Sequence, residues 1–269
     1  MKPRVDTVHS AANPTLTRIR RLVGDSALAR REGLVWLEGD HLCEAAAGRH
    51  WTIPIAVLAQ RGWSLPARQA LTAAAAAARV IVVPDHLFAG LSGLESPADI
   101  GFLAELPPLP GADPSLPSVV LDRLQDAGNA GSVLRSAAAL GVQQVLATAG
   151  TVALWSAKVL RAGMGAHFAL RLVEGLSETS LMDLGLSLVV ADAHAEHALP
   201  LAPLPTAACW VFGNEGRGVD PKLLSVASMR VRIPQPGGQE SLNVAAAAAI
   251  CLYESSCRRL REAPGAGHR

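Results

Sequence analysis

The strongest constraint on the fold is a series of short apolar runs in the second half of the chain, separated by stretches with helical patterning. The runs occupy residues 118–121, 145–147, 188–191, 210–212 and 231–233. Helical patterning occupies residues 131–140, 153–160, 223–227 and 242–260. Strands of a parallel sheet are apolar along their whole length because both faces of the sheet are covered. This half therefore predicts an α/β fold with a parallel sheet.

Five prolines fall in the sequence PPLPGADPSLP, from Pro107 to Pro117. Because proline opposes both helix and sheet, this stretch is expected to be extended. We therefore expect a domain at residues 1–106, a linker at 107–117 and a second domain at 118–269. The first domain is predicted to be a small α/β unit. Its expected strands are 34–38, 55–58 and 80–83, and its expected helices are 16–22, 41–47 and an alanine-rich stretch after 58.

Composition excludes several classes of protein. Half of the 269 residues are apolar, 17% are charged and the formal net charge is +1, which argues against extended disorder and against a strongly basic polyanion binder. The longest uncharged apolar runs, 70–78 and 244–253, are shorter than the roughly 18 to 20 residues of a membrane helix. Without a signal-peptide pattern at the amino terminus, we expect a cytoplasmic protein that does not contact a membrane.

The cysteines and histidines do not predict a metal site. Cys43, Cys209, Cys251 and Cys257 are scattered without a CxxC pair, which favours buried free thiols. His194 and His197 have no third ligand nearby in the sequence, so a solvated or capping role is favoured for them.

A basic cluster near the amino terminus is the clearest local charge asymmetry. Residues 1–35 contain seven basic side chains and three acidic ones. Arg18, Arg20, Arg21 and Arg30 are candidates for contacting the phosphates of a nucleic acid, because arginine clusters bind phosphates. The alternative is an ordinary solvated helical face.

Three polar motifs follow predicted strands of the second domain, where open α/β sheets bind their ligands. The first, LDRLQDAGNAGSVLRSAAALG, spans residues 121–141 and contains Asn129 and Arg135 near a predicted helix start. Its glycines allow backbone amides to approach a ligand. The alternative is an ordinary turn with Asn129 as a helix cap.

The second motif, VFGNEGRGV at residues 211–219, has glycines around Glu215 but neither the GK[ST] ending of a phosphate loop nor a GxGxxG pattern. A carboxylate there repels phosphate and tolerates a cation such as a sulfonium cofactor, unless the motif is only a tight turn. The third, IPQPGGQESLNVAAAAAICLYE at residues 233–254, places Ser241 and Asn243 before a helix of small residues. Ser241 has a simple alternative role as the cap of that helix.

Together, in order and spacing, the three motifs resemble the SpoU (TrmH-like) family of SPOUT methyltransferases. Members of that family transfer a methyl group from S-adenosylmethionine to a ribose 2'-hydroxyl in tRNA or ribosomal RNA. The first domain also resembles the substrate-binding domain of many members, at VWLEGDHLCEAA and ADIGFLAEL.

The resemblance implies a parallel-sheet domain with a carboxy-terminal trefoil knot, and a homodimer whose final helix packs against the partner. By motif position, the expected catalytic and RNA-facing residues are Asn129, Arg135, Glu215, Ser241 and Asn243, with Glu215 supporting Arg135. The expected residues that hold S-adenosylmethionine are Gly213, Ile233 and Leu242.

The chemistry limits what Arg135 can do. An arginine guanidinium stays protonated in proteins, so Arg135 is better suited to binding a phosphate and stabilising negative charge than to accepting a proton.

One departure from the family pattern leaves an alternative open. The first motif reads DAGNAG where the family usually has an aspartate-proline pair and a hydrophobic residue beside the asparagine. Besides a 2'-O-methyltransferase acting on structured RNA, with ribosomal RNA favoured over tRNA, the sequence therefore allows a non-catalytic RNA-binding dimer with the same fold. A nucleotide-dependent enzyme is disfavoured, because both of its glycine motifs are absent.

Overall fold

The computed structural model describes residues 3–93, 96–238 and 241–262, and the chain divides into two compact units. The first unit is Met1–Pro108 together with Trp155–Phe168, and the second is Leu109–Leu154 together with Ala169–Arg269. The sequence-based division placed residues 155–168 in the second domain and set residues 107–117 apart as a linker, whereas these two units meet between Pro108 and Leu109.

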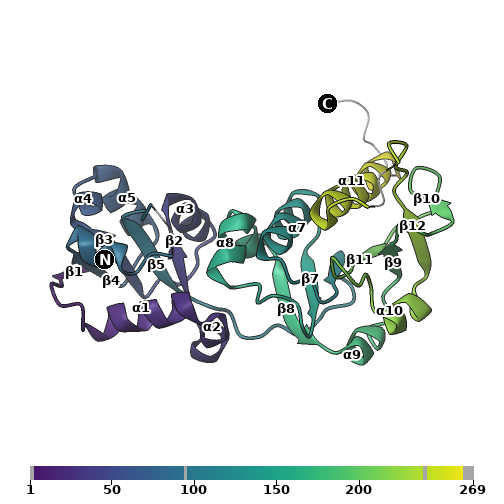
Figure 1. Ribbon diagram of the computed structural model, residues 1–269. Helices are drawn as coiled ribbons and strands as arrows, with labels where there is room; N and C mark the ends of the chain where they lie inside the picture. Colours follow the sequence, from purple (N-terminus) through teal and green to yellow (C-terminus); the bar gives the residue numbers. More distant parts are fainter. Residues whose placement is uncertain (1–2, 94–95, 239–240, 263–269) are drawn as a thin grey trace. The chain divides into compact units, whose positions relative to one another are not determined.

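The first unit is built on a five-stranded sheet with the order β1-β4-β3-β5-β2 (Figure 1). β1, β4 and β3 are parallel, whereas β5 is antiparallel to both of its neighbours. The strands are β1 Arg4–Thr7, β2 Leu34–Glu38, β3 Ile55–Ala59, β4 Arg79–Val83 and β5 Ile100–Glu105. The helices are α1 Pro14–Gly24, α2 Ser26–Glu32, α3 Asp40–Gly48, α4 Gln60–Trp63, α5 Pro66–Ala74 and α6 Asp85–Ala89.

Helix α1 illustrates how local sequence sets an element of this unit. The Asn13 side chain accepts hydrogen bonds from the backbone N–H groups of Thr15 and Leu16, at 2.9 and 3.4 Å, and Pro14 occupies the first turn. Both features favour a helix start, since the first N–H groups lack intrahelical partners. Leu16, Ile19 and Leu22 are buried at helical spacing, so one face of α1 packs into the core.

Residues 155–168 are fixed in the first unit by aromatic contacts. They contain helix α8, Ala157–Gly163, and most of a 3-10 helix, Ala166–Ala169. The ring of Trp51 lies 5.5 Å from the ring of Trp155 and 4.9 Å from that of Phe168, measured between centroids. Gly165 packs so closely that a Cβ there would lie 2.7 Å from the Cβ of Ala45 in α3. This segment is therefore part of the first core.

The second unit has a seven-stranded, all-parallel sheet with the order β10-β12-β9-β11-β6-β7-β8. The strands are β6 Ser118–Leu121, β7 Gln144–Thr148, β8 Arg171–Leu176, β9 Leu188–Ala191, β10 His197–Ala198, β11 Cys209–Phe212 and β12 Met229–Arg232. The helices are α7 Ala127–Ala139, α9 Glu178–Met182, α10 Pro221–Val226 and α11 Val244–Glu262. The predicted fold class, α/β with a parallel sheet, is confirmed.

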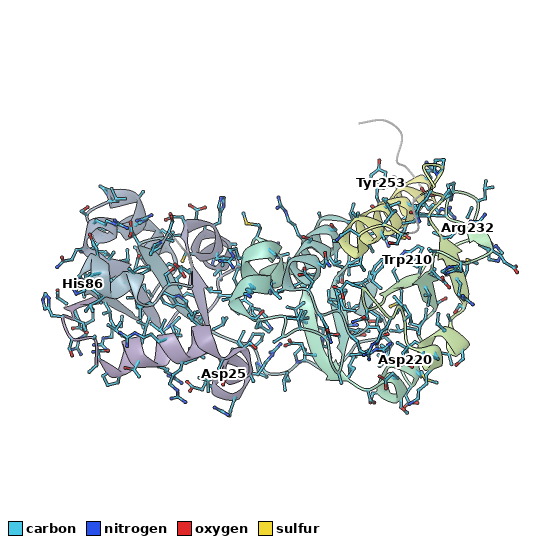
Figure 2. All side chains as sticks on the ribbon, viewed as in Figure 1. Asp25, His86, Trp210, Asp220, Arg232 and Tyr253 are labelled. Atoms are coloured by element: carbon cyan, nitrogen blue, oxygen red, sulfur yellow. The ribbon has the colours of Figure 1, made fainter. Side chains whose placement is uncertain are left out.

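Helices cover both faces of this sheet (Figure 1). On one face, Val211 of β11 packs in a cluster with Leu181 of α9 and Leu223 of α10. On the other face, the indole N–H of Trp210 donates a 2.8 Å hydrogen bond to the Ser255 hydroxyl of α11 (both elements are visible in Figure 2). The alternation along β11 thus explains why apolar side chains occupy both faces of each central strand.

Most predicted elements are found, with shifts at their ends. β12 ends at Arg232, so Ile233 lies in the following loop and not in the strand. α8 begins at Ala157, later than predicted, because Leu154 and Trp155 are buried in the turn before it. β1, β5, β8 and β10 were not predicted as strands. β1 is an edge strand with mostly exposed residues, which removes the apolar signal.

Candidate functional site

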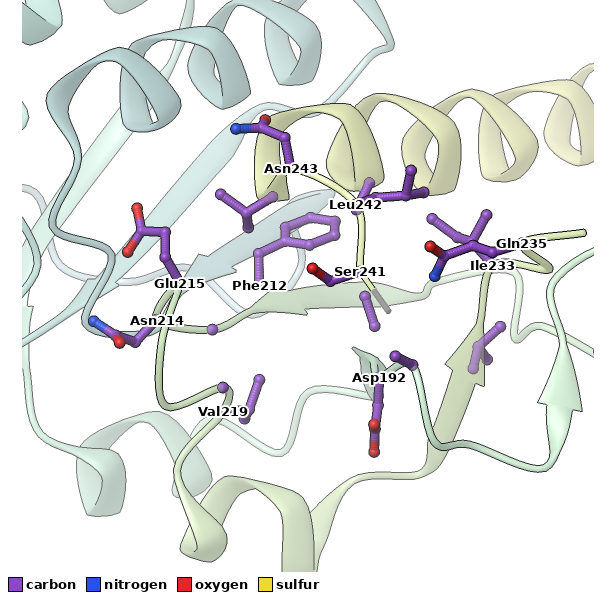
Figure 3. Close-up of a pocket in the computed structure, with 17 residues that line it drawn as sticks. Asp192, Phe212, Asn214, Glu215, Val219, Ile233, Gln235, Ser241, Leu242 and Asn243 are labelled. Atoms are coloured by element: carbon purple, nitrogen blue, oxygen red, sulfur yellow. The ribbon is translucent and has the colours of Figure 1, made fainter. Parts of the chain in front are cut away.

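The second and third predicted motifs line a cavity of about 360 Å³ at the carboxyl edge of the parallel sheet (Figure 3). The loops that follow β9, β11 and β12 form its wall. Six of the eight expected catalytic and cofactor residues line it: Gly213, Glu215, Ile233, Ser241, Leu242 and Asn243. Gln239 and Glu240 of the third motif lie outside the described residues.

Asn129 does not line the cavity but is hydrogen-bonded to two residues that do. Its Nδ2 donates to Glu215 Oε1 at 3.1 Å, and its Oδ1 accepts from Asn243 Nδ2 at 2.9 Å. One hydrogen-bonded chain therefore joins the starts of α7 and α11 to the loop after β11. The three motifs are brought together by side chains as well as by the sheet.

The amino termini of the two helices depend on aspartate and asparagine caps. Asp126 accepts from the backbone N–H of Asn129 at 2.7 Å and caps α7. Asn243 Oδ1 accepts from the backbone N–H groups of Ala245 and Ala246, at 2.9 and 3.3 Å. Asn243, and not Ser241, is therefore the residue that caps α11, which leaves the Ser241 hydroxyl at the cavity.

Glu215 is an ionised hydrogen-bond acceptor. Its carboxylate also accepts from the backbone N–H groups of Gln125 and Asp126, at 3.4 and 3.2 Å. Partial burial raises its pKa, but the hydrogen bonds from backbone N–H groups and from Asn129 outweigh burial, so the pKa lies below the ordinary value of 4.5. The carboxylate carries its negative charge at neutral pH.

Arg135 does not contact Glu215, contrary to the expectation from the sequence. The two residues form no ion pair, and within the described part of the chain the exposed Arg135 side chain forms no hydrogen bond. Arg135 follows Asn129 by six residues in α7, which turns it about 240° around the helix axis. The shared motif therefore places the two side chains on different faces of α7.

Gly213 and Gly218 give the loop after β11 its tight turn. Asn214 and Gly218 exchange backbone hydrogen bonds of 3.1 and 2.8 Å, and Gly218 has a positive φ of 68°. A Cβ on Gly213 would lie 2.4 Å from the backbone of Gly218 and Val219. Only glycine allows this close approach of backbone to backbone at the cavity wall.

A buried carboxylate that sequence reasoning missed holds the same loop. Asp122, fully buried after β6, accepts from Thr148 Oγ1 at 3.0 Å and from the backbone N–H of Asp220 at 2.7 Å. It also pairs with Arg123 through two hydrogen bonds of 3.1 and 3.0 Å, which raise the pKa of that guanidinium. The backbone carbonyl of Arg123 accepts from Asn214 Nδ2 at 2.9 Å. The signal in the sequence was an aspartate directly after an apolar strand.

The four arginines proposed to contact RNA lie on α1 and α2, and three of them have contacts within the first unit. Arg18 pairs with Glu32, Arg20 donates to the Ala11 carbonyl at 2.9 Å, and Arg30 lies 5.6 Å from the ring centroid of Trp155. Arg21 is exposed and its side chain has no such contact with a described residue.

The remaining predictions concern cysteines, metals and membranes. Cys43, Cys209 and Cys251 are buried free thiols as predicted, whereas Cys257 is partly exposed. Among the described residues no cluster of three or more His, Cys, Asp or Glu side chains has the arrangement of a metal site. No helix in the described ranges combines the length and apolar character needed to cross a membrane.

Comparison with known proteins identifies the family. A model of the SpoU rRNA Methylase family matches residues 117–253, which contain all three loops of the cavity. An uncharacterised tRNA/rRNA methyltransferase of Synechocystis sp. is 30% identical over 268 residues, covering 93% of each chain. The 23S rRNA (guanosine(2553)-2'-O)-methyltransferase of Bacillus subtilis is 30% identical over 175 residues, 64% of this chain and 70% of the relative.

A solved structure agrees over nearly the whole chain. A crystal structure described as an RNA 2'-O ribose methyltransferase is 31% identical and covers 94% of this chain and 99% of its own, with a TM-score of 0.78. The sequence match spans the cavity loops, and the structural match spans both units. Because both matches agree, the chain belongs to the SpoU rRNA Methylase family.

Proposed function

We propose that this chain methylates a ribose 2'-hydroxyl in structured RNA, with S-adenosylmethionine as the methyl donor. The family match and relatives named as RNA 2'-O-methyltransferases support RNA methylation. The observation that carries the proposal is the cavity at the carboxyl edge of the sheet, with Glu215 and Asn243 in its wall and Asn129 bonded to both.

The residues of the cavity fit S-adenosylmethionine. Phe212, Val219, Ile233 and Leu242 supply apolar surface for an adenine ring. The side-chain oxygen of Gln235, which also lines the cavity, is buried and accepts no hydrogen bond from a described residue, so it is available to a donor on a ligand. We propose that Gly213, Ile233 and Leu242 hold the cofactor through their backbone groups.

Bound S-adenosylmethionine supplies an activated methyl group on a positively charged sulfonium. The ionised Glu215 carboxylate attracts that positive charge, and Asn129 with Asn243 fixes the geometry around it. Ser241 offers a hydroxyl on the same wall. Because attack on a sulfonium methyl requires oxygen, carbon and sulfur in line, positioning by these groups supplies much of the rate.

Arg135 is proposed to act on the RNA. Its exposed, protonated guanidinium is suited to bind the phosphate next to the target ribose and to stabilise negative charge that develops on the 2'-oxygen. The hydroxyl proton then passes to that phosphate or to water.

We further propose a homodimer, a knotted carboxy-terminal segment and an RNA-binding role for the first unit. Ile250, Tyr253 and Leu260 are exposed apolar side chains on α11. They support the dimer, because a partner subunit would remove this apolar surface from water. A separate α/β unit before the catalytic unit supports recognition of a structured RNA, and ribosomal RNA is favoured over tRNA. The cytoplasmic location stays a prediction.

The non-catalytic alternative has no support from the first motif's loop. Ala127 and Ala130 stand where the family pattern has a proline and a hydrophobic residue, yet Asp126 caps α7 and Glu215 binds the amides of Gln125 and Asp126. The loop is held at both ends by hydrogen bonds that do not depend on a proline or a larger apolar residue.

The test is to incubate the purified chain with radiolabelled S-adenosylmethionine and total RNA from a strain that lacks the gene, then digest the RNA and map the labelled nucleoside. A 2'-O-methylated nucleoside in ribosomal RNA is expected. Cofactor binding without label in any RNA would point to a missing substrate context such as a ribosome-assembly intermediate. Absence of cofactor binding would contradict the proposed use of the cavity and favour the non-catalytic alternative.

A further inference from the structure

A second cavity, of about 350 Å³, lies wholly within residues of the first unit and has no role in the proposed methyl transfer. Its wall combines the ends of β2 and α1, the start of α3, Gly93 and one side of α8. The lining residues used below are Trp36, Glu38, Asp40, Ala157, Lys158 and Arg161.

The wall formed by α8 is fixed in place. Trp155, two residues before the helix, lies under the Arg30 guanidinium and beside Trp51. At the other end of α8, Gly165 contacts Ala45 of α3. Anchored on both sides, the helix presents a stable surface to the cavity rather than a mobile flap.

The acidic residues of the cavity already accept hydrogen bonds. Asp40 accepts two hydrogen bonds from Arg68, at 3.0 and 2.9 Å, in a bidentate ion pair. The Glu38 carboxylate accepts from the Ser92 hydroxyl and from the backbone N–H of Gly93, the latter at 3.4 Å. Arg68 therefore neutralises the charge of Asp40, whereas Glu38 keeps its negative charge and is stabilised by two neutral donors.

The basic residues of the cavity are not paired. Lys158 and Arg161 are exposed, three residues apart on α8, so both side chains emerge from the same side of the helix. Within the described ranges, neither forms a hydrogen bond or an ion pair through its side chain. The two unpaired cations outnumber Glu38, the one lining carboxylate without an ion pair among the described residues, so the net charge at this cavity is positive, beside apolar surface from Val23, Leu42 and Leu160.

We propose that this cavity binds one nucleotide of the RNA substrate, other than the methylated one. The base occupies the cavity and its phosphate binds Lys158 and Arg161. The volume lies in the range of about 300 to 1,000 Å³ that is usual for small-molecule sites. Unpaired cations beside an apolar hollow match the two halves of a nucleotide, its phosphate and its base. This inference rests on the proposed function, because it takes RNA as the substrate.

The test compares three variants with the wild-type chain in binding to 23S ribosomal RNA transcribed in vitro. The first is Lys158→Glu combined with Arg161→Glu, and the second is Ala157→Trp, which fills the cavity from an exposed position without changing charge. The control, Arg49→Glu, reverses an exposed charge at the other end of α3. Binding is measured by filter retention at several salt concentrations, and S-adenosylmethionine binding by calorimetry.

We expect the double variant and Ala157→Trp each to weaken RNA binding at least tenfold, and Arg49→Glu to change it less than twofold. The slope of log affinity against log salt concentration should become shallower for the double variant, by about 0.7 for each single-strand phosphate that is no longer neutralised. Cofactor affinity should be unchanged in all three, because the cavity at the sheet edge is untouched.

RNA affinity equal to wild type in the double variant, or an equal loss in Arg49→Glu, would overturn the inference. A thermal shift of the wild type with millimolar guanosine or adenosine monophosphate that is lost in the double variant, with unchanged RNA affinity, would reassign the cavity to a free nucleotide. If the wild type binds RNA through this cavity but transfers no methyl group, the proposed function fails while this inference stands.

Discussion

Asn129 has its amide orientation fixed by its two neighbours. The ionised Glu215 carboxylate can only accept, so Asn129 presents Nδ2 to it, and the Oδ1 that remains accepts from Asn243. A change in the charge or donor character of Glu215 therefore reaches Asn243 through Asn129. The hydrogen bonds of Glu215, Asn129 and Asn243 therefore couple three loops that are far apart in the sequence.

The variant Glu215→Gln tests the contribution of these hydrogen bonds to stability, through the pH dependence of its melting temperature. The glutamine amide would meet the N–H donors of Asn129, Gln125 and Asp126. Because Glu215 is exposed and water screens these contacts, we expect a loss of about 0.5 to 1 kcal/mol of unfolding free energy. A carboxylate whose folded pKa is lowered stabilises the fold above its unfolded pKa and loses that contribution as the pH falls through the folded pKa. The melting-temperature gap between wild type and variant should thus be constant near neutral pH and narrow below about 4.5.

The control is Glu196→Gln, an exposed carboxylate outside this network. Its melting temperature should follow the wild type at every pH. A gap for Glu215→Gln that does not depend on pH would show that the carboxylate charge is not the source of its stabilisation.

Arg135→Ala tests the proposed role in catalysis. We expect kcat/KM for RNA methylation to fall about 10² to 10³-fold, as when one donor to a developing oxyanion is removed. S-adenosylmethionine affinity and melting temperature should be unchanged, because Arg135 is exposed and outside the cavity lining. Arg135→Lys should recover only part of the rate, since lysine lacks the planar fork. Unchanged turnover in Arg135→Ala would contradict the role.

Among the elements, strand β6 matters most for the site because its end supplies both Asp122 and the start of the loop to α7. Asp122 Oδ1 accepts from Thr148 and Arg123, and Oδ2 accepts from Arg123 and the Asp220 amide. This one carboxylate therefore ties β6 to the end of β7 and to the start of α10. The loop of the second motif ends at Asp220, whose backbone N–H donates to Asp122.

Asp122→Asn should destabilise the second unit, because an amide group must turn its NH₂ toward donors on one side or the other. Loss of a buried charge pair costs about 3 to 5 kcal/mol, and the partial exposure of Arg123 puts this case near the lower value. Thermal melting should shift down by about 5 to 10 °C, and S-adenosylmethionine affinity should fall with it. The matched control is Asp183→Asn, the same change at an exposed residue. An equal shift in melting temperature for Asp183→Asn would contradict the role given to Asp122.

The apolar strands of the parallel sheet could be predicted because burial on both faces leaves a composition that other elements rarely have. β1 could not, because its residues are mostly exposed and its place is set by pairing with β4, which is distant in sequence. The grouping of Asn129, Glu215 and Asn243 followed from motifs at strand ends. The separation of Arg135 from Glu215 did not, since it depends on the rotation of α7.

At the scale of the whole molecule, buried thiols provide a reporter in each unit. Cys43 lies in the first, and Cys209 and Cys251 lie in the second. Burial raises the pKa of Cys209 and Cys251 to about 12 and also raises that of Cys43. Because the thiolate is the reactive form, these three should be inert to Ellman's reagent at pH 8 in the native protein, while Cys257 reacts.

Mass spectrometry of the labelled protein in rising urea identifies the order in which the thiols become reactive. Cys209 and Cys251 should appear together, because they share one unit. Rapid native labelling of Cys43, Cys209 or Cys251 would contradict the burial described for them.

The segment from Trp155 to Phe168 makes the first unit discontinuous in the sequence. A protease cut within residues 107–117 severs one connection, yet the carboxy-terminal fragment still carries the helix and aromatic rings that complete the other fragment's core. The two pieces should therefore elute together after nicking and separate only when the first unit unfolds. The amino-terminal piece expressed alone would lack part of its core, and the two fragments complement each other. Gene fusion or domain exchange at the proline-rich stretch would therefore disrupt the first unit.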